Sequence, residues 1–358
     1  MRSGEGVALK APVRILVVED SPTARQLLVT ILESDGRFKV IGEASDGEAA
    51  VRAAAQLRPD LVTMDIHLPV QDGFAATRQI METCPTRIVM VTSTALPHEA
   101  AASFRALESG ALTVLAKPMG PLDPLFAATR EELCRTVALM SEVPVVRRWP
   151  AERLKRRPRP HPVVAHPWPI RLVAVGASTG GPLALQALLS VLRRGFDAPM
   201  VVVQHISTGF ADGLAQWLSS SSGHPVCVAT HGEAARSGMV YLAPDGAHLE
   251  VDSDLRLVLR DSPPEFCFRP AVGPLFRSVA AQVGAASAGL LLTGMGHDGA
   301  HDLKLMRESG ALTMAQDSAS AAVYGMPREA LRLDAAAHVL SPEAMADALN
   351  RLISTTRE

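Results

Sequence analysis

Short apolar runs alternate with amphipathic stretches over the first 140 residues of the chain. The apolar runs predict buried strands at 14–19, 38–43, 61–64, 87–91 and 112–116. The amphipathic stretches predict helices at 21–32, 47–56, 73–82, 99–109 and 123–139. Ser21 and Pro22 suit the N-cap and the first position of the first helix. This alternation predicts an α/β domain of (βα)5 form, whose doubly wound parallel sheet binds ligands at the carboxyl ends of its strands.

The same kind of alternation returns between residues 170 and 354. Apolar runs predict buried strands at 171–175, 200–204 and 288–293, and an apolar helix at 183–192 follows the first of them. We therefore expect a second α/β domain with a doubly wound, Rossmann-like parallel sheet and a mixed edge.

The residues between these two regions have a different composition. Residues 143–169 contain seven prolines, seven basic side chains and one acidic side chain. Proline removes backbone donors and fixes an extended backbone, so this stretch does not suit a helix or a central strand. The chain therefore divides into domains at 12–140 and 170–354 with a linker at 141–169. The linker is either a solvated, semi-rigid tether or a docking segment for an acidic partner.

Charge and composition exclude several classes of protein. The 358 residues include 35 Lys and Arg against 37 Asp and Glu, and this near-neutral balance argues against bulk binding to nucleic acid or to an anionic membrane. No apolar run approaches the roughly 20 residues of a membrane span, and residues 1–10 lack an apolar signal core, so we expect a cytoplasmic protein without membrane insertion. The four cysteines form no CxxC pair, which argues against a zinc site or a disulfide framework.

Acidic residues follow two strands of the first predicted sheet. Glu19 and Asp20 come at the end of the first strand and Asp65 at the end of the third, while Thr92 and Lys117 end the fourth and fifth. Three carboxylates at one place repel one another unless a hard cation lies between them, and oxygen ligands suit Mg²⁺. A lysine and a hydroxyl group at the same edge indicate a bound phosphoryl group. The set predicts phosphoryl transfer to a carboxylate nucleophile.

A glycine-rich turn, GASTGGP at 176–182, follows the first strand of the second domain. Gly176, Ser178 and Gly180 fit the GxSxG pattern of a nucleophile elbow between a strand and a helix. A phosphate cradle at the helix N-terminus is a second interpretation, although the turn has neither GxGxxG nor GK[ST]. A tight turn with a capping serine is the third.

A serine nucleophile needs a base, and the base needs an acid that orients it. His205 comes directly after the strand at 200–204, and Asp298 follows the strand at 288–293 between glycines. All three residues belong at the carboxyl edge of one sheet, where ligands bind. The order Ser178, His205, Asp298 differs from that of the α/β-hydrolases, in which the acid precedes the histidine, and it favours a convergent triad.

The motifs VVEDS, MDIHLPVQDG, VTST and AKP, in this order and spacing, resemble the receiver domain of bacterial two-component response regulators over about residues 12–135. The resemblance implies that a partner histidine kinase phosphorylates Asp65. It also implies that Glu19, Asp20 and Asp65 hold Mg²⁺, and that Thr92 and Lys117 contact the phosphoryl oxygens.

The motifs GASTGGP, QHI, FRPAVGPLF, LLTGMGHDGA, AQD and VYGMP resemble the catalytic domain of chemotaxis protein-glutamate methylesterases over about residues 170–354. The resemblance implies hydrolysis of glutamyl methyl esters on the cytoplasmic helices of methyl-accepting chemoreceptors, and deamidation of receptor glutamines, without a cofactor for the hydrolysis. It makes Ser178 the nucleophile, His205 the general base and acid, and Asp298 the orienting carboxylate. The further positions that it implies are Thr179 beside the nucleophile, the Met295 amide as an oxyanion donor, and Arg269 near the substrate path.

Three positions depart from that family's pattern. Asp302 replaces a glycine, Ser207 a proline and Ala211 a threonine. Asp302 either raises the local negative potential or caps the following helix. A receptor-binding adaptor without enzymatic activity is the alternative function, and it is disfavoured because all three triad residues are present. A transcription regulator is disfavoured because residues 170–358 carry 14 basic and 18 acidic side chains and no basic recognition helix.

Regulation follows as a hypothesis from the order of the two domains. The receiver would pack over the catalytic cleft, and phosphorylation of Asp65 would shift the population toward an open arrangement.

Overall fold

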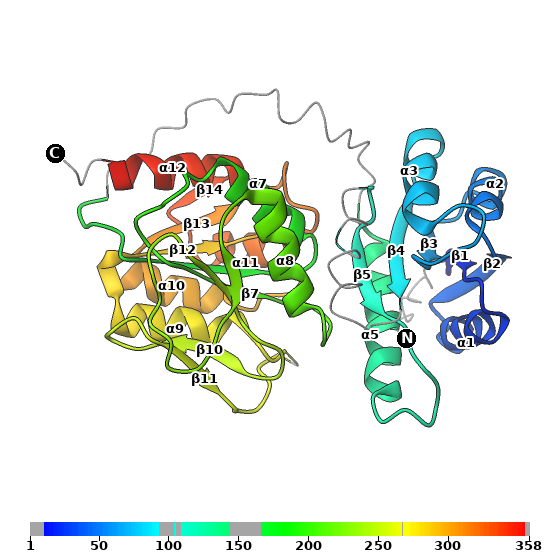
Figure 1. Cartoon of the computed structure of the whole chain (residues 1–358), viewed down its shortest axis with the longest axis horizontal. Coiled ribbons are helices and arrows are strands. Elements are labelled where there is room, and N and C mark those ends of the chain that lie inside the picture. The colour runs from blue at the N-terminus through cyan, green and yellow to red at the C-terminus, as the bar shows by residue number, and fades with distance from the viewer. Residues whose placement is uncertain (1–10, 93–103, 105–108, 144–165, 267, 355–358) are drawn as a thin grey trace, which may run out of the picture. The chain divides into compact units, whose positions relative to one another are not determined.

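The computed structural model of the chain describes residues 11–92, 104, 109–143, 166–266 and 268–354. The described residues form two compact units (Figure 1), and each is described by itself. The first contains residues 11–92 and 109–143, and the second contains residues 166–354. Most of the predicted helix at 99–109 and most of the predicted linker lie outside the described residues.

The first unit is a five-stranded sheet with the order β2-β1-β3-β4-β5 and only parallel pairings. Its strands are β1 (Val13–Val18), β2 (Phe38–Ala44), β3 (Leu61–Met64), β4 (Arg87–Thr92) and β5 (Thr113–Ala116). Its described helices are α1 (Pro22–Glu33), α2 (Gly47–Leu57), α3 (Gly73–Thr83) and α5 (Phe126–Met140). The parallel α/β fold predicted from the sequence is confirmed in these elements.

Short polar side chains begin the first three helices of this unit. Ser21 caps α1 with Pro22 at its first position, as predicted, and Ser21 Oγ accepts a hydrogen bond from Ala24 N. Asp46 and Asp72 accept bonds of 2.7 Å from backbone amides in the first turns of α2 and α3. These caps fix the residue at which each helix begins after its strand. The strand order of the sheet reverses direction between β1 and β3.

The second unit is a seven-stranded sheet with the order β14-β13-β12-β6-β7-β9-β8. Its strands are β6 (Leu172–Ala177), β7 (Met200–Gln204), β8 (Val226–Val228), β9 (Val240–Leu242), β12 (Ser287–Leu291), β13 (Leu312–Gln316) and β14 (His338–Leu340). Its helices are α7 (Gly181–Val191), α8 (Ala211–Ser222), α9 (Val272–Gln282), α10 (Ala300–Glu308), α11 (Met326–Arg332) and α12 (Pro342–Ser354), with a 3₁₀ turn at Gly284–Ala286. Figure 1 shows these helices around the sheet.

The central strands β6, β7 and β12 are buried along their whole length. Strands covered on both faces have continuous apolar sequences, and this explains why their apolar runs do not alternate with polar residues. Strands β7, β9 and β8 lie on one side of β6, and the later strands β12, β13 and β14 lie on its other side. Strand β6 is therefore the point at which the strand order reverses, where ligands bind in such sheets.

The mixed edge expected for this sheet is wrong, because every pairing within it is parallel. Antiparallel pairing occurs in a separate hairpin of β10 (His248–Val251) and β11 (Leu257–Arg260). Apolar side chains from both strands of this hairpin are buried with residues of α9 in one core cluster. Packing against α9, rather than pairing with an edge strand, places the hairpin beside the sheet.

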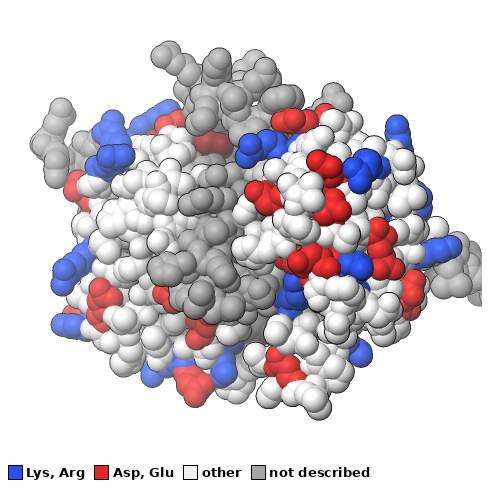
Figure 2. Space-filling view, turned by 45° about the vertical axis from the view of Figure 1, so that its right-hand side comes forward, with Lys and Arg blue, Asp and Glu red and all other residues white. Residues whose placement is uncertain are grey.

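Charged side chains of both signs are interspersed over the face shown in Figure 2, and no extended basic field lies among the described residues of that face. Among the described helices, none combines the length and the apolar character that crossing a lipid bilayer requires. Of the four cysteines, Cys84, Cys134 and Cys227 are free thiols, and Cys267 lies outside the described residues.

Candidate functional sites

The three residues of the expected triad lie at the carboxyl ends of three neighbouring strands. Ser178 follows β6, His205 follows β7, and Asp298 lies in the loop after β12. Strand β6 pairs directly with the other two, and His205 N continues the ladder by donating to Ala177 O at 2.9 Å. Ser178 and Asp298 are buried, and the His205 side chain is 4% exposed.

Asp298 is held from two directions. Its Oδ2 lies 2.8 Å from His205 Nε2, and the same oxygen accepts a bond of 2.7 Å from Val272 N. Its Oδ1 accepts a bond of 3.1 Å from Gly273 N, so the carboxylate sits on the first turn of α9. Burial alone raises the pKa of Asp298, but the bond and charge of His205 and the two amide bonds outweigh burial and hold the pKa below its ordinary value.

The His205 ring is held at one face and at one of its nitrogens. It stacks on the Phe268 ring with centroids 3.8 Å apart and an angle of 7° between the planes. Because Nε2 faces a carboxylate, we assign the proton of the neutral ring to Nε2 and the lone pair to Nδ1. Nδ1 is buried and makes no hydrogen bond within the described part of the chain, so it is the ring nitrogen that is free to accept a proton.

Ser178 occupies a tight turn between β6 and α7. Its N–H donates to Thr293 O at 3.0 Å, and its carbonyl accepts Gly181 N at 2.8 Å. Gly180 has φ 78° and is the N-cap of α7, with no side-chain capping bond. The interpretation of Ser178 as a capping serine is therefore wrong, and the turn connects a strand directly to a helix.

The glycine-rich loop after β12 lies against this turn. A Cβ atom at Gly294 would approach Ser178 Cβ to 2.7 Å, so only glycine allows the backbone to pass this close. Met295 comes next and is 42% exposed, and Gly296 turns the chain with φ 81° toward Asp298. The loop therefore brings both the carboxylate and the Met295 amide to the edge that carries the serine.

Two further expected residues, Thr179 and Arg269, differ in their contacts with the triad region: Thr179 is bonded to the end of β12, and Arg269 is bonded within its own loop. Thr179 O accepts a hydrogen bond of 2.9 Å from Thr293 Oγ1, which ties the serine turn to the end of β12. Arg269 Nη1 lies 2.8 Å from Asp261 Oδ1 and also donates to Ser262 O. These contacts are within the loop 261–271, and none joins Arg269 to Ser178, His205 or Asp298.

Gln204 is a buried residue of this site that the sequence interpretation did not single out. Its amide Nε2 donates to Ser178 O and to His205 O, each at 2.8 Å. One side chain thus links the backbone of the nucleophile turn to that of the histidine. The signal was present in the sequence, because Gln204 directly precedes His205 at the end of an otherwise apolar strand.

Asp302, the first departure from the family pattern, does not cap α10. The N-cap of that helix is Gly299, and Asp302 is buried in the first turn with Oδ1 3.0 Å from Arg277 Nη1. Asp302 is therefore neutralised by an arginine of α9.

The other two departures lie at the start of α8. Ser207 is buried and its carbonyl accepts Phe210 N, while Ala211 is the first residue of α8.

The strand ends of the first unit gather the predicted acidic residues. Carboxylate oxygens of Glu19, Asp20 and Asp65 lie within 4.8 Å of one another. Lys117 Nζ lies 2.7 Å from both Glu19 Oε2 and Asp65 Oδ2. Thr92 is buried at the end of β4, and its carbonyl accepts Lys117 N at 2.8 Å. All five predicted residues therefore meet at one edge of the sheet.

The donor set of this edge fits a divalent cation. Burial and the charge of Asp65 raise the pKa of Glu19 above its ordinary value, although Lys117 acts in the opposite direction. Burial lowers the pKa of Lys117, yet its bonds to Asp65 and Glu19 outweigh burial and leave the pKa raised. Negative charge thus exceeds what one lysine neutralises, and Glu19, Asp20 and Asp65 are oxygen ligands of the kind that Mg²⁺ prefers.

Comparisons with known proteins match both units. Residues 15–129 match the family model of the response regulator receiver domain, and residues 173–349 match that of the CheB methylesterase. A protein-glutamate methylesterase/protein-glutamine glutaminase of Geobacter metallireducens is 46% identical, over 95% of this chain and 99% of the relative. Another of Myxococcus xanthus is 47% identical, over 97% and 98%. The crystal structure of the Thermotoga maritima CheB methylesterase catalytic domain is similar at a TM-score of 0.50, with 33% identity, over 51% of this chain and 98% of that one.

A receiver domain with an acidic cluster at one sheet edge, followed by a parallel-sheet hydrolase domain, defines a response regulator with an enzymatic output domain. More closely, the chain belongs to the protein-glutamate methylesterase/protein-glutamine glutaminase family and is a carboxylic ester hydrolase of the CheB type.

Asp20→Asn tests the cation site without disturbing the core, because Asp20 is the exposed member of the three carboxylates. We expect Mg²⁺ binding to weaken by about tenfold or more, since the change removes one negative oxygen ligand. Isothermal titration of the full chain with Mg²⁺ measures the affinity. Glu43→Gln, which alters a carboxylate paired with Arg25 at the end of β2, is the matched control and should leave the affinity unchanged.

Gln204→Met tests the buried amide while keeping the length of the side chain. We expect the free energy of unfolding of the second unit to fall by about 1–3 kcal/mol, because one buried and one partly buried carbonyl lose their donor. Urea denaturation followed by the fluorescence of the buried Trp217 measures it. Gln282→Met, at an exposed position of α9, should leave stability within about 0.5 kcal/mol, and an equal loss in both variants would contradict the role of Gln204.

Proposed function

We propose that this protein hydrolyses methyl esters on glutamate side chains of methyl-accepting chemoreceptors, and deamidates receptor glutamines, with Ser178, His205 and Asp298 as its catalytic residues. The single observation that carries the proposal is the His205 ring, which has Asp298 at one nitrogen and a free, buried Nδ1 at the other. The relatives' names state both activities, which supports the choice of substrate.

In this mechanism His205 Nδ1 takes the Ser178 hydroxyl proton as Oγ attacks the ester carbonyl carbon. The tetrahedral intermediate collapses with loss of methanol, which receives that proton from His205. Water then attacks the acyl-enzyme with His205 again as the base, and a free glutamate leaves Ser178. For a glutamine substrate the first leaving group is ammonia. No cofactor takes part in these proton transfers.

Charge develops at two places during the attack. The imidazolium of His205 forms against the Asp298 carboxylate, whose lowered pKa keeps it ionised at neutral pH. The oxyanion forms beside Ser178, where the Met295 N–H and the N-terminal turn of α7 are the donors in this proposal. Thr179, which follows the nucleophile, borders the same position.

Regulation in this proposal begins at Asp65, which accepts a phosphoryl group from a chemosensory histidine kinase. Lys117 Nζ, 2.7 Å from Asp65 Oδ2, is the cation that neutralises the added oxygens, and Thr92 offers a hydroxyl at the neighbouring strand end. Mg²⁺ held by Glu19, Asp20 and Asp65 supplies further neutralising charge when it is bound. The phosphorylated receiver then raises the activity of the hydrolase domain.

Ser178→Ala tests the nucleophile. We expect methanol release from methylated receptor membranes to fall to the level without enzyme, because Ala has no hydroxyl to form the acyl-enzyme. Gas chromatography of the released methanol measures the activity. Ser190→Ala, on the exposed side of α7, should retain it. Undiminished methanol release by Ser178→Ala would refute the mechanism, and no release by the unchanged chain on any methylated receptor would favour an adaptor.

Asp65→Asn tests regulation separately from catalysis. We expect the basal rate of methanol release to persist and the stimulation by acetyl phosphate to disappear, because the amide cannot accept the phosphoryl group. The initial rate with and without acetyl phosphate and Mg²⁺ measures this. Equal stimulation of Asp65→Asn and the unchanged chain would rule out Asp65 as the regulatory site.

A further inference from the structure

A short turn in the loop 261–271 carries the ring that stacks on His205. Glu265 N donates to Phe268 O at 3.1 Å, and Phe268 N donates to Glu265 O at 2.8 Å. These two bonds fix the positions of the two residues relative to each other. The Phe268 ring in turn lies parallel to the His205 imidazole at 3.8 Å. Whatever holds Glu265 therefore also holds the surface against which the imidazole rests.

Arg277 holds Glu265 to the body of the domain. Its Nη2 lies 2.5 Å from Glu265 Oε1, and its Nη1 lies 3.0 Å from Asp302 Oδ1 on α10. Burial lowers the pKa of Arg277, but the two carboxylates outweigh burial and leave the pKa raised. One planar guanidinium on α9 thus binds both the loop and α10. Its Nη1 pairs with the buried Asp302, and its Nη2 pairs with the more exposed Glu265.

The same helix carries the donors for Asp298. Val272 N and Gly273 N, in the first turn of α9, bind the carboxylate that faces His205 Nε2, and Arg277 lies one turn further along. A Cβ atom on Gly273 would come within 2.8 Å of both Arg277 Nη1 and Asp302 Oδ2, so the cluster adjoins the Asp298 site. Helix α9 thereby connects both restraints on the imidazole, the carboxylate at its edge and the ring at its face.

We propose that Arg277 is a positioning residue for the His205 imidazole, acting through Glu265 and Phe268, and that Asp302 anchors it. This inference rests on the proposed function for its kinetic consequence, but its structural part does not depend on turnover. Arg277 touches neither the triad nor the substrate in this role.

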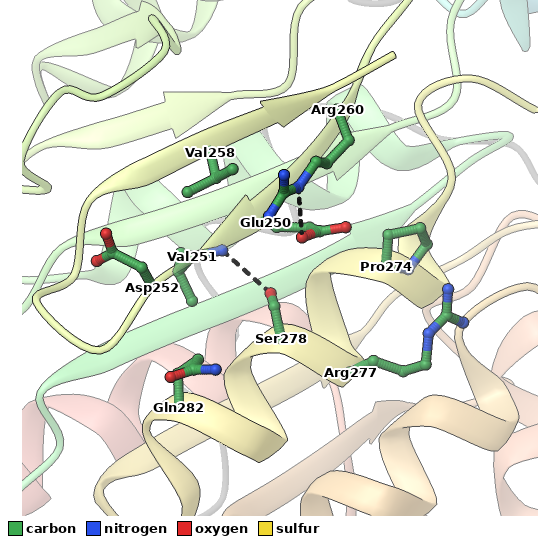
Figure 3. Close-up of a pocket in the computed structure, with 9 residues that line it drawn as sticks. All are labelled: Glu250, Val251, Asp252, Val258, Arg260, Pro274, Arg277, Ser278 and Gln282. Atoms are coloured by element: carbon green, nitrogen blue, oxygen red, sulfur yellow. Dashed lines mark hydrogen bonds and ion pairs between the residues drawn. The ribbon is translucent and has the colours of Figure 1, made fainter. Parts of the chain in front are cut away.

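Arg277 is also accessible from outside. It borders an open pocket of about 310 Å³ between the β10–β11 hairpin and α9, shown in Figure 3. Across the pocket Arg260 Nε lies 3.3 Å from Glu250 Oε2, and both side chains project from the hairpin. Arg260 is therefore a matched control, an arginine at the same pocket that pairs with a carboxylate outside the path to His205.

The first experiment observes the imidazole directly, in the full chain labelled with [¹³Cε1]-histidine. The stacked Phe268 ring should shift the His205 Hε1 resonance upfield, with the assignment taken from His205→Gln. We expect Phe268→Leu to abolish the upfield shift of the His205 Hε1 resonance. Arg277→Ala should move the resonance most of the way toward its position in Phe268→Leu, and Arg260→Ala should leave it where it is in the unchanged chain. An unshifted signal in the unchanged chain, or an unaltered signal in Arg277→Ala, would overturn the proposal whether or not the protein hydrolyses receptor esters.

The second experiment measures kcat and KM for methanol release. We expect Arg277→Ala to lower kcat by about tenfold to a hundredfold with KM changed less than about threefold, because misplacing a catalytic group acts on the chemical step. Guanidinium at a non-denaturing concentration should enter the pocket and restore part of kcat in Arg277→Ala, while urea should not. The kcat of Arg277→Lys should fall between that of the unchanged chain and that of Arg277→Ala. The kcat of Arg260→Ala should change with neither guanidinium nor urea.

The urea midpoint of each variant separates positioning from unfolding. A lower kcat that follows a lower midpoint, without recovery by guanidinium, would show a merely structural role and overturn the proposal. Asp302→Asn keeps the shape of the anchor and removes its charge, and we expect a smaller loss of kcat in the same direction. An unchanged kcat in Arg277→Ala would also overturn it.

Discussion

The buried carboxylate of Asp298 is the constraint on which the catalytic unit depends. It receives hydrogen bonds from His205 Nε2 and from two amides in the first turn of α9. A buried charge is tolerated only where donors surround it, so the start of α9, the end of β7 and the loop after β12 must meet at one point. Gly299 reflects that requirement, because a Cβ atom there would overlap the Val272 side chain. The parallel order of β12, β6 and β7 supplies the frame for this meeting.

Both units follow one rule, that chemistry lies where parallel strands end, but they balance charge differently. In the first unit Lys117 pairs with Glu19 and Asp65, two of the three carboxylates, and burial together with the charge of Asp65 raises the pKa of Glu19. In the second unit the pKa of Asp298 is lowered, because the hydrogen bonds from His205 and from two backbone amides outweigh the effect of burial. The first edge therefore suits a divalent cation, whereas the second holds a carboxylate that stays ionised beside the His205 ring.

Strand-end residues could be found from the sequence because a short apolar run fixes where a strand stops, and parallel strands bring their ends together. Ser178, His205 and Asp298 were found in this way, as were Glu19 and Asp65. The pairing direction of β10 and β11 could not, since a short apolar strand has the same pattern beside a sheet as at its edge. Gln204, Phe268 and Arg277 were missed because their roles arise from contacts between distant segments, which no local period encodes.

Asp302 shows how such contacts accommodate a second buried carboxylate near Asp298. Asp302 lies in the first turn of α10, four residues after Asp298 in the preceding loop, and both carboxylates approach Gly273 on α9. A second unpaired carboxylate there would oppose ionisation of the first, as like charges in one site do. Arg277 removes that conflict by binding Asp302, and its other nitrogen reaches Glu265 on the loop that carries Phe268. The pKa of Asp298 stays low because His205 and two amides of α9 bind its carboxylate. The bonds of Arg277 to Asp302 and Glu265 tie the loop that carries the histidine's stacking partner to the core of the domain.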